Sequence, residues 1–206
     1  MIRAVISDFG GVLTNPLREA FMAWNEKIGA DPGVLGMALQ RASEKRGDHP
    51  LFELEKGLLT EGEFTAIVQA ELPPAIHLTG FSEIYFEHLH PNEPMISLMR
   101  SLRERGMRMA ILTNNVREWE PLWRAKLPVD EIFDVVVDSA FVGMRKPDHA
   151  IYELTVERLG DGLGASECLF VDDVDVNCAA AAELGMTAIQ YVSPEQAIPE
   201  IERALA

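Results

Sequence analysis

The sequence has few cysteines and few basic residues, and both shortages limit what the chain can do. Only two of the 206 residues are cysteines, Cys168 and Cys178. Both lie in apolar stretches, so we expect buried small side chains rather than a disulfide or a metal-binding pair. Lysine and arginine together number 18 against 33 acidic residues, which gives a formal net charge of −15. So acidic a chain is not expected to bind nucleic acid, although a local lysine and a metal ion could still neutralise a phosphorylated ligand.

Long apolar runs are also missing. No stretch approaches the roughly 20 apolar residues of a membrane-spanning helix, and the run that begins the chain is too short for a signal peptide. We therefore expect no membrane partner and, by default, a cytoplasmic location. The chain is 48% hydrophobic and 25% charged, the balance of a globular protein. Its length suits one domain with a smaller inserted module, and it leaves the oligomeric state open.

Short apolar runs alternate with helical periodicity, which predicts a parallel sheet covered by helices. The expected strands are residues 4–6, 107–112, 133–137, 168–171 and 187–192. The expected helices between the later strands are residues 94–105, 148–159 and 174–184. The predicted fold class is α/β, a three-layer Rossmann-like core with helices on both faces of the sheet.

About a hundred residues separate the first two expected strands, far more than one crossover helix needs. This interval shows helical periodicity at residues 17–28, 34–46, 60–72 and 81–89, with turn-forming prolines and glycines between them. We predict a helical cap over residues 16–90, inserted into a core made of residues 1–15 and 91–206. Most aromatic residues of the cap are expected in the bundle's own core: Trp24, Phe52, Phe64, Phe81, Tyr85 and Phe86.

Polar side chains follow three of the expected strands. Asp8 follows the first, Thr113 and Asn114 follow the second, and Asp172 and Asp173 follow the run that begins at Cys168. A fourth element, containing Lys146, leads from a loop into a helix. Each could be a turn or a helix cap, but loops at the carboxyl ends of parallel strands converge on one edge of the sheet, where ligands bind.

These four elements, in this order, resemble the motifs of the haloacid dehalogenase superfamily. The positions are Asp8, Thr113, Lys146 and the pair Asp172-Asp173. The surrounding residues fit as well: Ile111-Leu112-Thr113-Asn114, Lys146-Pro147-Asp148, and Phe170-Val171-Asp172-Asp173 followed by Asn177. The resemblance covers nearly the whole chain and is to phosphatase-type members with a helical cap after the first motif.

The resemblance implies a Mg²⁺-dependent hydrolase of a small phosphorylated metabolite that acts through an aspartyl-phosphate. Asp8 would attack phosphorus, and Lys146 would offset negative charge. Thr113 and the backbone amide of Asn114 would bind a phosphoryl oxygen. Mg²⁺ would be held by Asp8, the carbonyl of Gly10 and Asp173, with Asp172 holding a metal-bound water. We assign Asp175 and Asn177 to capping or loop bracing, outside the core site.

One position departs from the phosphatase pattern. Phosphatases of this family usually carry a second Asp two residues after the nucleophile, as acid and base, whereas this chain has Gly10. Its absence could cost about 10²–10⁴-fold on a poor leaving group. Three accounts remain open: a leaving group that needs little protonation, such as an acyl phosphate or a sugar-1-phosphate; another acid, from the cap or a water chain; or a regulatory module that binds phosphate and metal with little turnover.

A 2-haloacid dehalogenase is a further reading of the same fold. Those members also lack the second Asp, and they also begin from an Asp nucleophile. They need no magnesium, however, and the intact Asp172-Asp173 pair favours a metal site. We therefore rank dehalogenation below phosphate chemistry.

Overall fold

The computed structural model describes residues 1–29, 31–78 and 80–206. Its sheet has five parallel strands in the order β3-β2-β1-β4-β5. The strands are β1 (Ala4–Ser7), β2 (Arg108–Thr113), β3 (Val135–Asp138), β4 (Cys168–Asp172) and β5 (Thr187–Gln190). Each overlaps an expected strand, and the predicted α/β class is confirmed.

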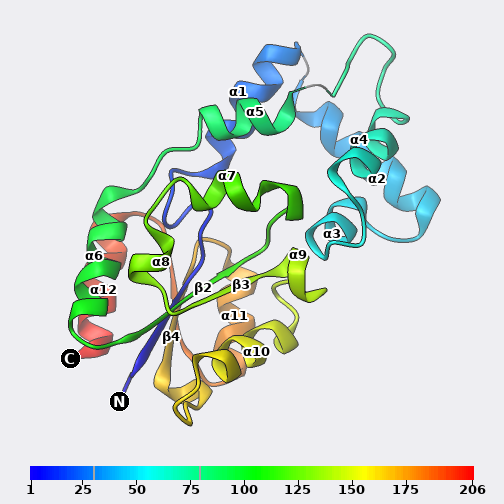
Figure 1. Ribbon diagram of the computed structural model, residues 1–206. Coiled ribbons are helices and arrows are strands. Elements are labelled where there is room, and N and C mark those ends of the chain that lie inside the picture. Colours follow the sequence, from blue (N-terminus) through cyan, green and yellow to red (C-terminus); the bar gives the residue numbers. More distant parts are fainter. Residues whose placement is uncertain (30, 79) are drawn as a thin grey trace.

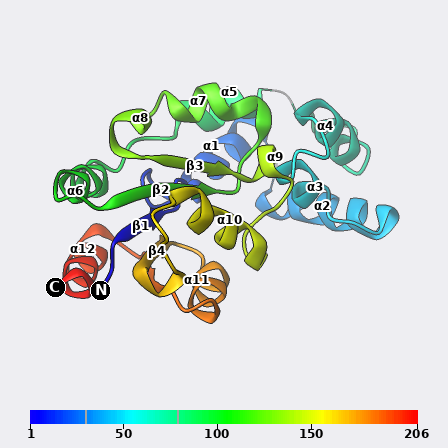
Figure 2. The same ribbon diagram turned by 60° about the horizontal axis from the view of Figure 1, so that its bottom comes forward.

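Alternation along the strands explains why both faces of the sheet are covered. Ala4 and Ile6 of β1 point into one apolar cluster, and Val5 points into the other. The first cluster lies under α10 (His149–Leu159) and α11 (Asp175–Glu183). The second lies under α6 (Glu93–Glu104) and α12 (Pro194–Leu205) on the opposite face (Figure 2). Strands buried on both faces are near-continuous apolar runs, as residues 4–6 and 168–171 are.

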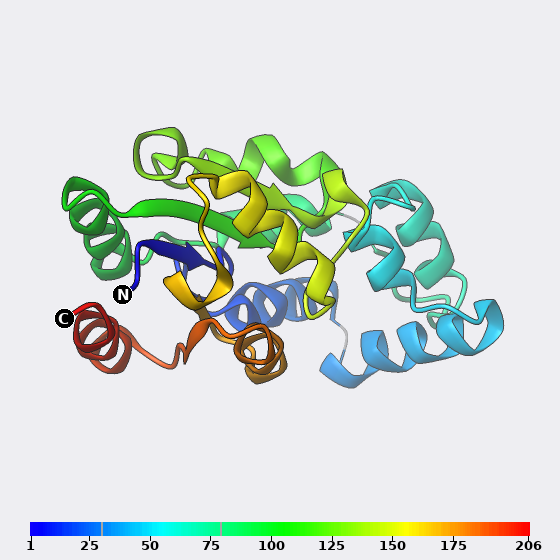
Figure 3. The same cartoon turned by 90° about the horizontal axis from the view of Figure 1, so that it is seen from below.

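Between β1 and α6 the regular elements of the described chain are all helices. The helices are α1 (Leu17–Ile28), α2 (Pro32–Arg46), α3 (Pro50–Glu55), α4 (Glu61–Gln69) and α5 (Phe81–Glu87). Figures 1 and 3 show α2, α3 and α4 to one side of the sheet, beyond the carboxyl ends of the strands. The division into a core of residues 1–15 and 91–206 and a cap of residues 16–90 stays a prediction, and we keep the name cap for the latter range.

The helices that periodicity does not predict are mostly short, and one of them has a proline in its interior. They are α3, α7 (Glu120–Arg124), α8 (Val129–Ile132), α9 (Ser139–Val142), α12 and the 3₁₀ turns η1 (Arg117–Trp119) and η2 (Ala165–Glu167). Most are too short for a repeating apolar pattern, and α12 carries Pro199 in its interior. Within the described residues, no helix combines the length and the apolar character that crossing a membrane requires.

Candidate active site

Three predicted residues meet at the carboxyl edge of the sheet. Lys146 Nζ lies 2.7 Å from Asp8 Oδ1 and 2.6 Å from Asp172 Oδ2. All three side chains are buried, and Lys146 is 1% exposed. A buried ammonium that bridges two carboxylates is a charge-assisted network, which fixes the geometry of all three groups.

Strand register explains why segments so distant in sequence meet. Ser7, the last residue of β1, is paired with Ile111 on one side and Val171 on the other. The backbone N–H of Asp8 then donates to the carbonyl of Val171 at 2.8 Å. In the sheet, β2 and β3 lie on one side of β1, whereas the later strands β4 and β5 lie on its other side. The carboxyl end of β1 is therefore the point at which the strand order reverses, and ligands bind at such points in parallel sheets.

Asn114 holds Lys146 in place by a reciprocal pair of hydrogen bonds. Its side-chain Nδ2 donates to the carbonyl of Lys146 at 3.0 Å, and the Lys146 N–H donates to its Oδ1 at 2.8 Å. Sequence reasoning assigned only the backbone amide of Asn114 and missed this use of its side chain. The neighbouring Thr113 is buried at the end of β2.

Asp8, Asp172 and Asp173 form an acidic cluster in which each offers one oxygen, all within 4.8 Å of one another. Both oxygens of Asp172 are already engaged. Oδ2 accepts from Lys146, and Oδ1 accepts from the N–H of Val174 at 2.9 Å and from Nδ2 of Asn177 at 3.0 Å. Asp173 is only half-buried, so its carboxylate is more accessible to an ion.

Asn177 therefore braces the site directly. Its side chain is buried, and its carbonyl accepts a 3.0 Å hydrogen bond from the hydroxyl of Tyr152 in α10. Loop bracing is what the sequence suggests for Asn177, but the group that it braces is Asp172. The position of Asn177 in the first turn of α11, five residues after Asp172, is the only sequence signal for this role.

The charges of the cluster are unbalanced. Burial raises the pKa of Asp8 to about 7; the ammonium of Lys146 opposes this rise, while Asp172 and Asp173 add to it. Burial and Asp172 also raise the pKa of Asp173. Burial would lower the pKa of Lys146, but Asp8 and Asp172 outweigh it and raise that pKa. Three carboxylates with one ammonium form a site that a divalent cation would neutralise, and carboxylate oxygens are ligands that Mg²⁺ prefers.

Gly11 allows Asp173 to approach the loop after β1. Its φ is +80°, and a Cβ atom built there would lie 2.5 Å from Asp173 Oδ2. A side chain at this position would thus be strained by the backbone and would push the carboxylate away.

We expect Gly11→Ala to destabilise the fold by about 1–3 kcal/mol and to weaken Mg²⁺ binding, because Asp173 is displaced. Chemical denaturation and calorimetric titration with Mg²⁺ measure the two effects. Gly106→Ala is the matched control, since Gly106 has a φ of +87° and a Cβ atom added there would meet nothing within 4 Å. Equal Mg²⁺ affinity in the two variants would contradict the predicted role of the Asp173 contact.

A cavity of about 730 Å³ opens from this edge of the sheet toward the cap. Asp8, Gly10, Thr113, Lys146 and Asp173 are among the residues that line it. All these residues were predicted for the site, and the cavity brings them together.

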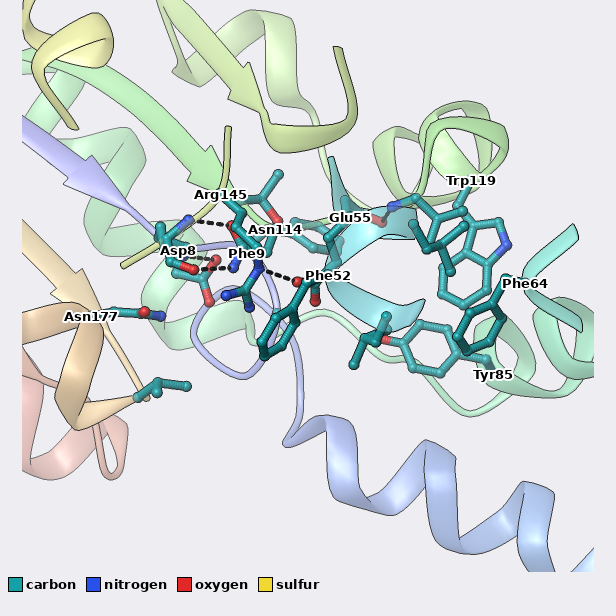
Figure 4. Close-up of a pocket in the computed structure, with 18 of the residues that line it drawn as sticks. Asp8, Phe9, Phe52, Glu55, Phe64, Tyr85, Asn114, Trp119, Arg145 and Asn177 are labelled. Atoms are coloured by element: carbon teal, nitrogen blue, oxygen red, sulfur yellow. Dashed lines mark hydrogen bonds and ion pairs between the residues drawn. The ribbon is translucent and has the colours of Figure 1, made fainter. Parts of the chain in front are cut away.

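Arg145 and Glu55 join core and cap at the cavity wall, a contact that the sequence does not reveal. Arg145 Nε donates to Glu55 Oε2 of α3 at 2.6 Å, and the Arg145 guanidinium lies 4.0 Å from the centre of the Phe52 ring (Figure 4). Burial raises the pKa of Glu55, with Arg145 opposing it. Only the adjacency of Arg145 to Lys146 could have signalled its involvement.

Several of the cap aromatics expected in the bundle's core also border the cavity. Trp24, Phe52, Phe64 and Tyr85 line it, while Phe86 packs into an apolar cluster shared with the core. The side chain of Phe81 lies outside what the structure describes. Trp24, Tyr85 and Phe86 are buried, as expected, although Tyr85 and Phe86 share their apolar cluster with the core, and Phe52 is 42% exposed.

Sequence comparison identifies relatives over nearly the full length. The chain matches the family described as haloacid dehalogenase-like hydrolase over residues 2–185. It is 32% identical to mouse acyl-CoA dehydrogenase family member 10, over 98% of this chain but only 19% of that protein. It is 29% identical to a glyceraldehyde 3-phosphate phosphatase of Methanocaldococcus jannaschii, over 67% of this chain and 63% of that protein. The chain thus spans about a fifth of the mouse relative.

Solved structures share the fold. A predicted HAD-like family hydrolase from Porphyromonas gingivalis superimposes with a TM-score of 0.74 at 24% identity, covering 100% of this chain and 98% of that one. A HAD family enzyme from Bacteroides thetaiotaomicron, in complex with magnesium and inorganic phosphate, gives 0.70 at 22% identity, with 93% and 95% covered. L-2-haloacid dehalogenase from Xanthobacter autotrophicus gives 0.64 at 17% identity, with 98% and 83% covered.

At these sequence identities the similarity shows the fold alone, and it is shared by the phosphate-bound enzyme and by the dehalogenase. The family match covers far more than half of the chain and agrees with the four motifs and with the residues that meet at the edge of the sheet. The chain belongs to the haloacid dehalogenase-like hydrolases.

Proposed function

We propose that the chain hydrolyses a small phosphorylated metabolite with Mg²⁺, through an aspartyl-phosphate on Asp8. The observation that carries the proposal is the buried Lys146 ammonium between Asp8 and Asp172, beside an acidic cluster at the polar end of a cavity. A dehalogenase needs no such cation site. The M. jannaschii relative is named as a phosphatase, and the Bacteroides structure contains magnesium and phosphate, which supports the same assignment.

In the proposed reaction, a carboxylate oxygen of Asp8 attacks phosphorus, and the bond from phosphorus to the leaving-group oxygen breaks. Lys146 holds Asp8 in line, and its charge offsets the negative charge of the phosphoryl group. Thr113 and the backbone amide of Asn114 would bind a phosphoryl oxygen. Water then attacks phosphorus, releases phosphate and restores Asp8.

We further propose that Asp8, the carbonyl of Gly10 and Asp173 hold Mg²⁺, with Asp172 reaching it through water. The accessible Asp173 carboxylate and the engaged oxygens of Asp172 support this order. When bound, the ion would draw negative charge from the phosphoryl oxygens.

Because residue 10 is a glycine, the site lacks the second Asp that usually protonates the leaving group in phosphatases of this family. Glu55 is a cap carboxylate in the cavity wall, and burial raises its pKa despite the opposing charge of Arg145, so it is the alternative acid that the cavity offers. We favour instead a leaving group that departs with little protonation, because Glu55 is held by Arg145 and is not part of the acidic cluster around Asp8. Acyl phosphates, sugar-1-phosphates and aryl phosphates are all of this kind.

Release of phosphate from phenyl phosphate tests the proposal. We expect turnover with Mg²⁺ and none above background after chelation. Asp173→Asn should raise the Mg²⁺ concentration for half-maximal rate by more than about 10-fold. The control Asp175→Asn should change it little, because Asp175 is exposed and lies outside the cluster.

Two results would contradict the proposal. Release of chloride from 2-chloropropionate without Mg²⁺, and no release of phosphate, would indicate a dehalogenase. Binding of Mg²⁺ and phosphate without any turnover would indicate the regulatory module.

A further inference from the structure

The part of the cavity farther from Asp8 has an apolar wall. Trp24 of α1, Leu39 of α2, Phe52 of α3, Phe64 of α4 and Tyr85 of α5 all line the cavity. Trp119, from the segment after β2, completes the wall, with its ring centroid 5.1 Å from that of Tyr85. In Figure 4, Phe64, Tyr85 and Trp119 gather at the side away from Asp8, with Phe52 and Arg145 between.

The cap side of the cavity has few polar side chains. Along the described cap wall the polar side chains are those of Glu55 and Thr65. The indole N–H of Trp24 and the hydroxyl of Tyr85 are the other polar side-chain groups there. Glu55 is already paired with Arg145 at 2.6 Å. A sugar placed here would bury several hydroxyls with too few partners, and each unsatisfied hydroxyl is costly.

The volume also suits a larger group than phosphate. At about 730 Å³ the cavity lies within the range of sites that enclose drug-sized ligands. Asp8, Thr113 and Lys146 occupy one end, so a phosphate group there would direct the rest of the substrate into the apolar part. The apolar surface is thus continuous with the proposed phosphoryl site.

We propose that the leaving group of the substrate is an apolar chain or ring system, bound between the cap aromatics and Trp119. This inference rests on the proposed function and names its substrate class. It favours apolar acyl or aryl phosphates over the sugar-1-phosphates that Gly10 alone would also allow.

Para-alkylphenyl phosphates provide the test, because lengthening the alkyl chain leaves the acidity of the phenol nearly unchanged. From 4-methylphenyl to 4-pentylphenyl phosphate we expect kcat/KM to rise about three- to fourfold per methylene. Glucose 1-phosphate should be a poorer substrate than any of them. Binding of alkylphosphonates with Mg²⁺, measured by calorimetry, tests the same preference without turnover.

Leu39→Gln should reduce the gain per methylene to below about twofold. Leu35→Gln, one helical turn earlier on the same cavity wall, is a second variant should Leu39→Gln fail to fold. Met37→Gln is the matched control on α2, because Met37 is 51% exposed and does not line the cavity. Melting temperatures establish that each variant is folded.

The outcomes separate the two proposals. Turnover without dependence on chain length, or preference for glucose 1-phosphate, overturns the apolar leaving group and leaves the phosphatase standing. Binding of phosphonates that depends on chain length, without turnover of any ester, overturns the phosphatase and leaves the apolar binding site standing. Failure of both measurements overturns both proposals.

Discussion

Asp8→Asn is expected to lower phosphate release by at least about 10⁴-fold, because it removes the attacking group itself. Asp8 is the carboxylate held by Lys146 at 2.7 Å, and its backbone is fixed by the hydrogen bond to Val171. An amide in its place is a far weaker nucleophile. Steady-state release of phosphate from phenyl phosphate, with Mg²⁺ present, measures the loss.

Labelled phosphate on the protein gives a more direct readout. Acid-quenched wild type should carry label that hydroxylamine removes, as an acyl phosphate does, and Asp8→Asn should carry none. Asp175→Asn is the matched control and should retain both label and rate. Hydroxylamine-sensitive label on Asp8→Asn would show that another residue is the nucleophile.

Folding of this variant can be checked through the dependence of stability on pH. In the metal-free wild type, the pKa of Asp8 is raised from 3.8 to about 7. The folded state then holds a proton that the unfolded state releases, so Asp8 makes stability fall as pH rises between these values. Asp8→Asn should remove this contribution and be at least as stable as wild type at pH 8. A large loss of stability instead would mean that inactivity reflects unfolding.

Lys146→Met is expected to have the second largest effect. It leaves the buried carboxylates of Asp8 and Asp172 without their shared ammonium. Breaking a buried pair in this way costs about 3–5 kcal/mol of stability, and removing a charge that stabilises the transition state costs about 10²–10³-fold in kcat. Urea denaturation and single-turnover kinetics measure the two losses.

A double variant distinguishes a catalytic from a structural role of Lys146. Lys146→Met combined with Asp172→Asn removes one of the stranded carboxylates and should recover part of the stability but not the rate. Lys126→Met is the control outside the site, since Lys126 donates to the carbonyl of Phe86. Recovery of rate together with stability in the double variant would mean that Lys146 only supports the fold.

Local features of the sequence predicted the core of the fold because strand formation here depends on short-range patterns. Residues 4–6 and 168–171 are continuous apolar runs, as strands buried on both faces must be. The helix at Leu17–Ile28 was predicted with its observed bounds. Elements without enough length for a pattern, such as α3, were missed.

The candidate site could be predicted only in part, for a related reason. Asp8, Lys146 and Asp172 follow strands or precede a helix, and parallel strands bring such positions to one edge. The hydrogen bond from the Asn114 side chain to Lys146 and that from the Asn177 side chain to Asp172 depend on side-chain rotamers and on the paths of the loops. No spacing rule determines these contacts.

By itself, the sequence determined which chemical groups stand at the edge of the sheet, because apolar runs mark the strands and the carboxyl ends of parallel strands converge on one edge. Only the tertiary structure decided what surrounds the rest of a ligand. Glu55 and Arg145 are 90 residues apart in the chain, and Trp24, Phe64 and Trp119 come from separate helices and turns. Whether such side chains fill a bundle or line a hollow depends on how rigid elements pack against one another, which no local pattern specifies.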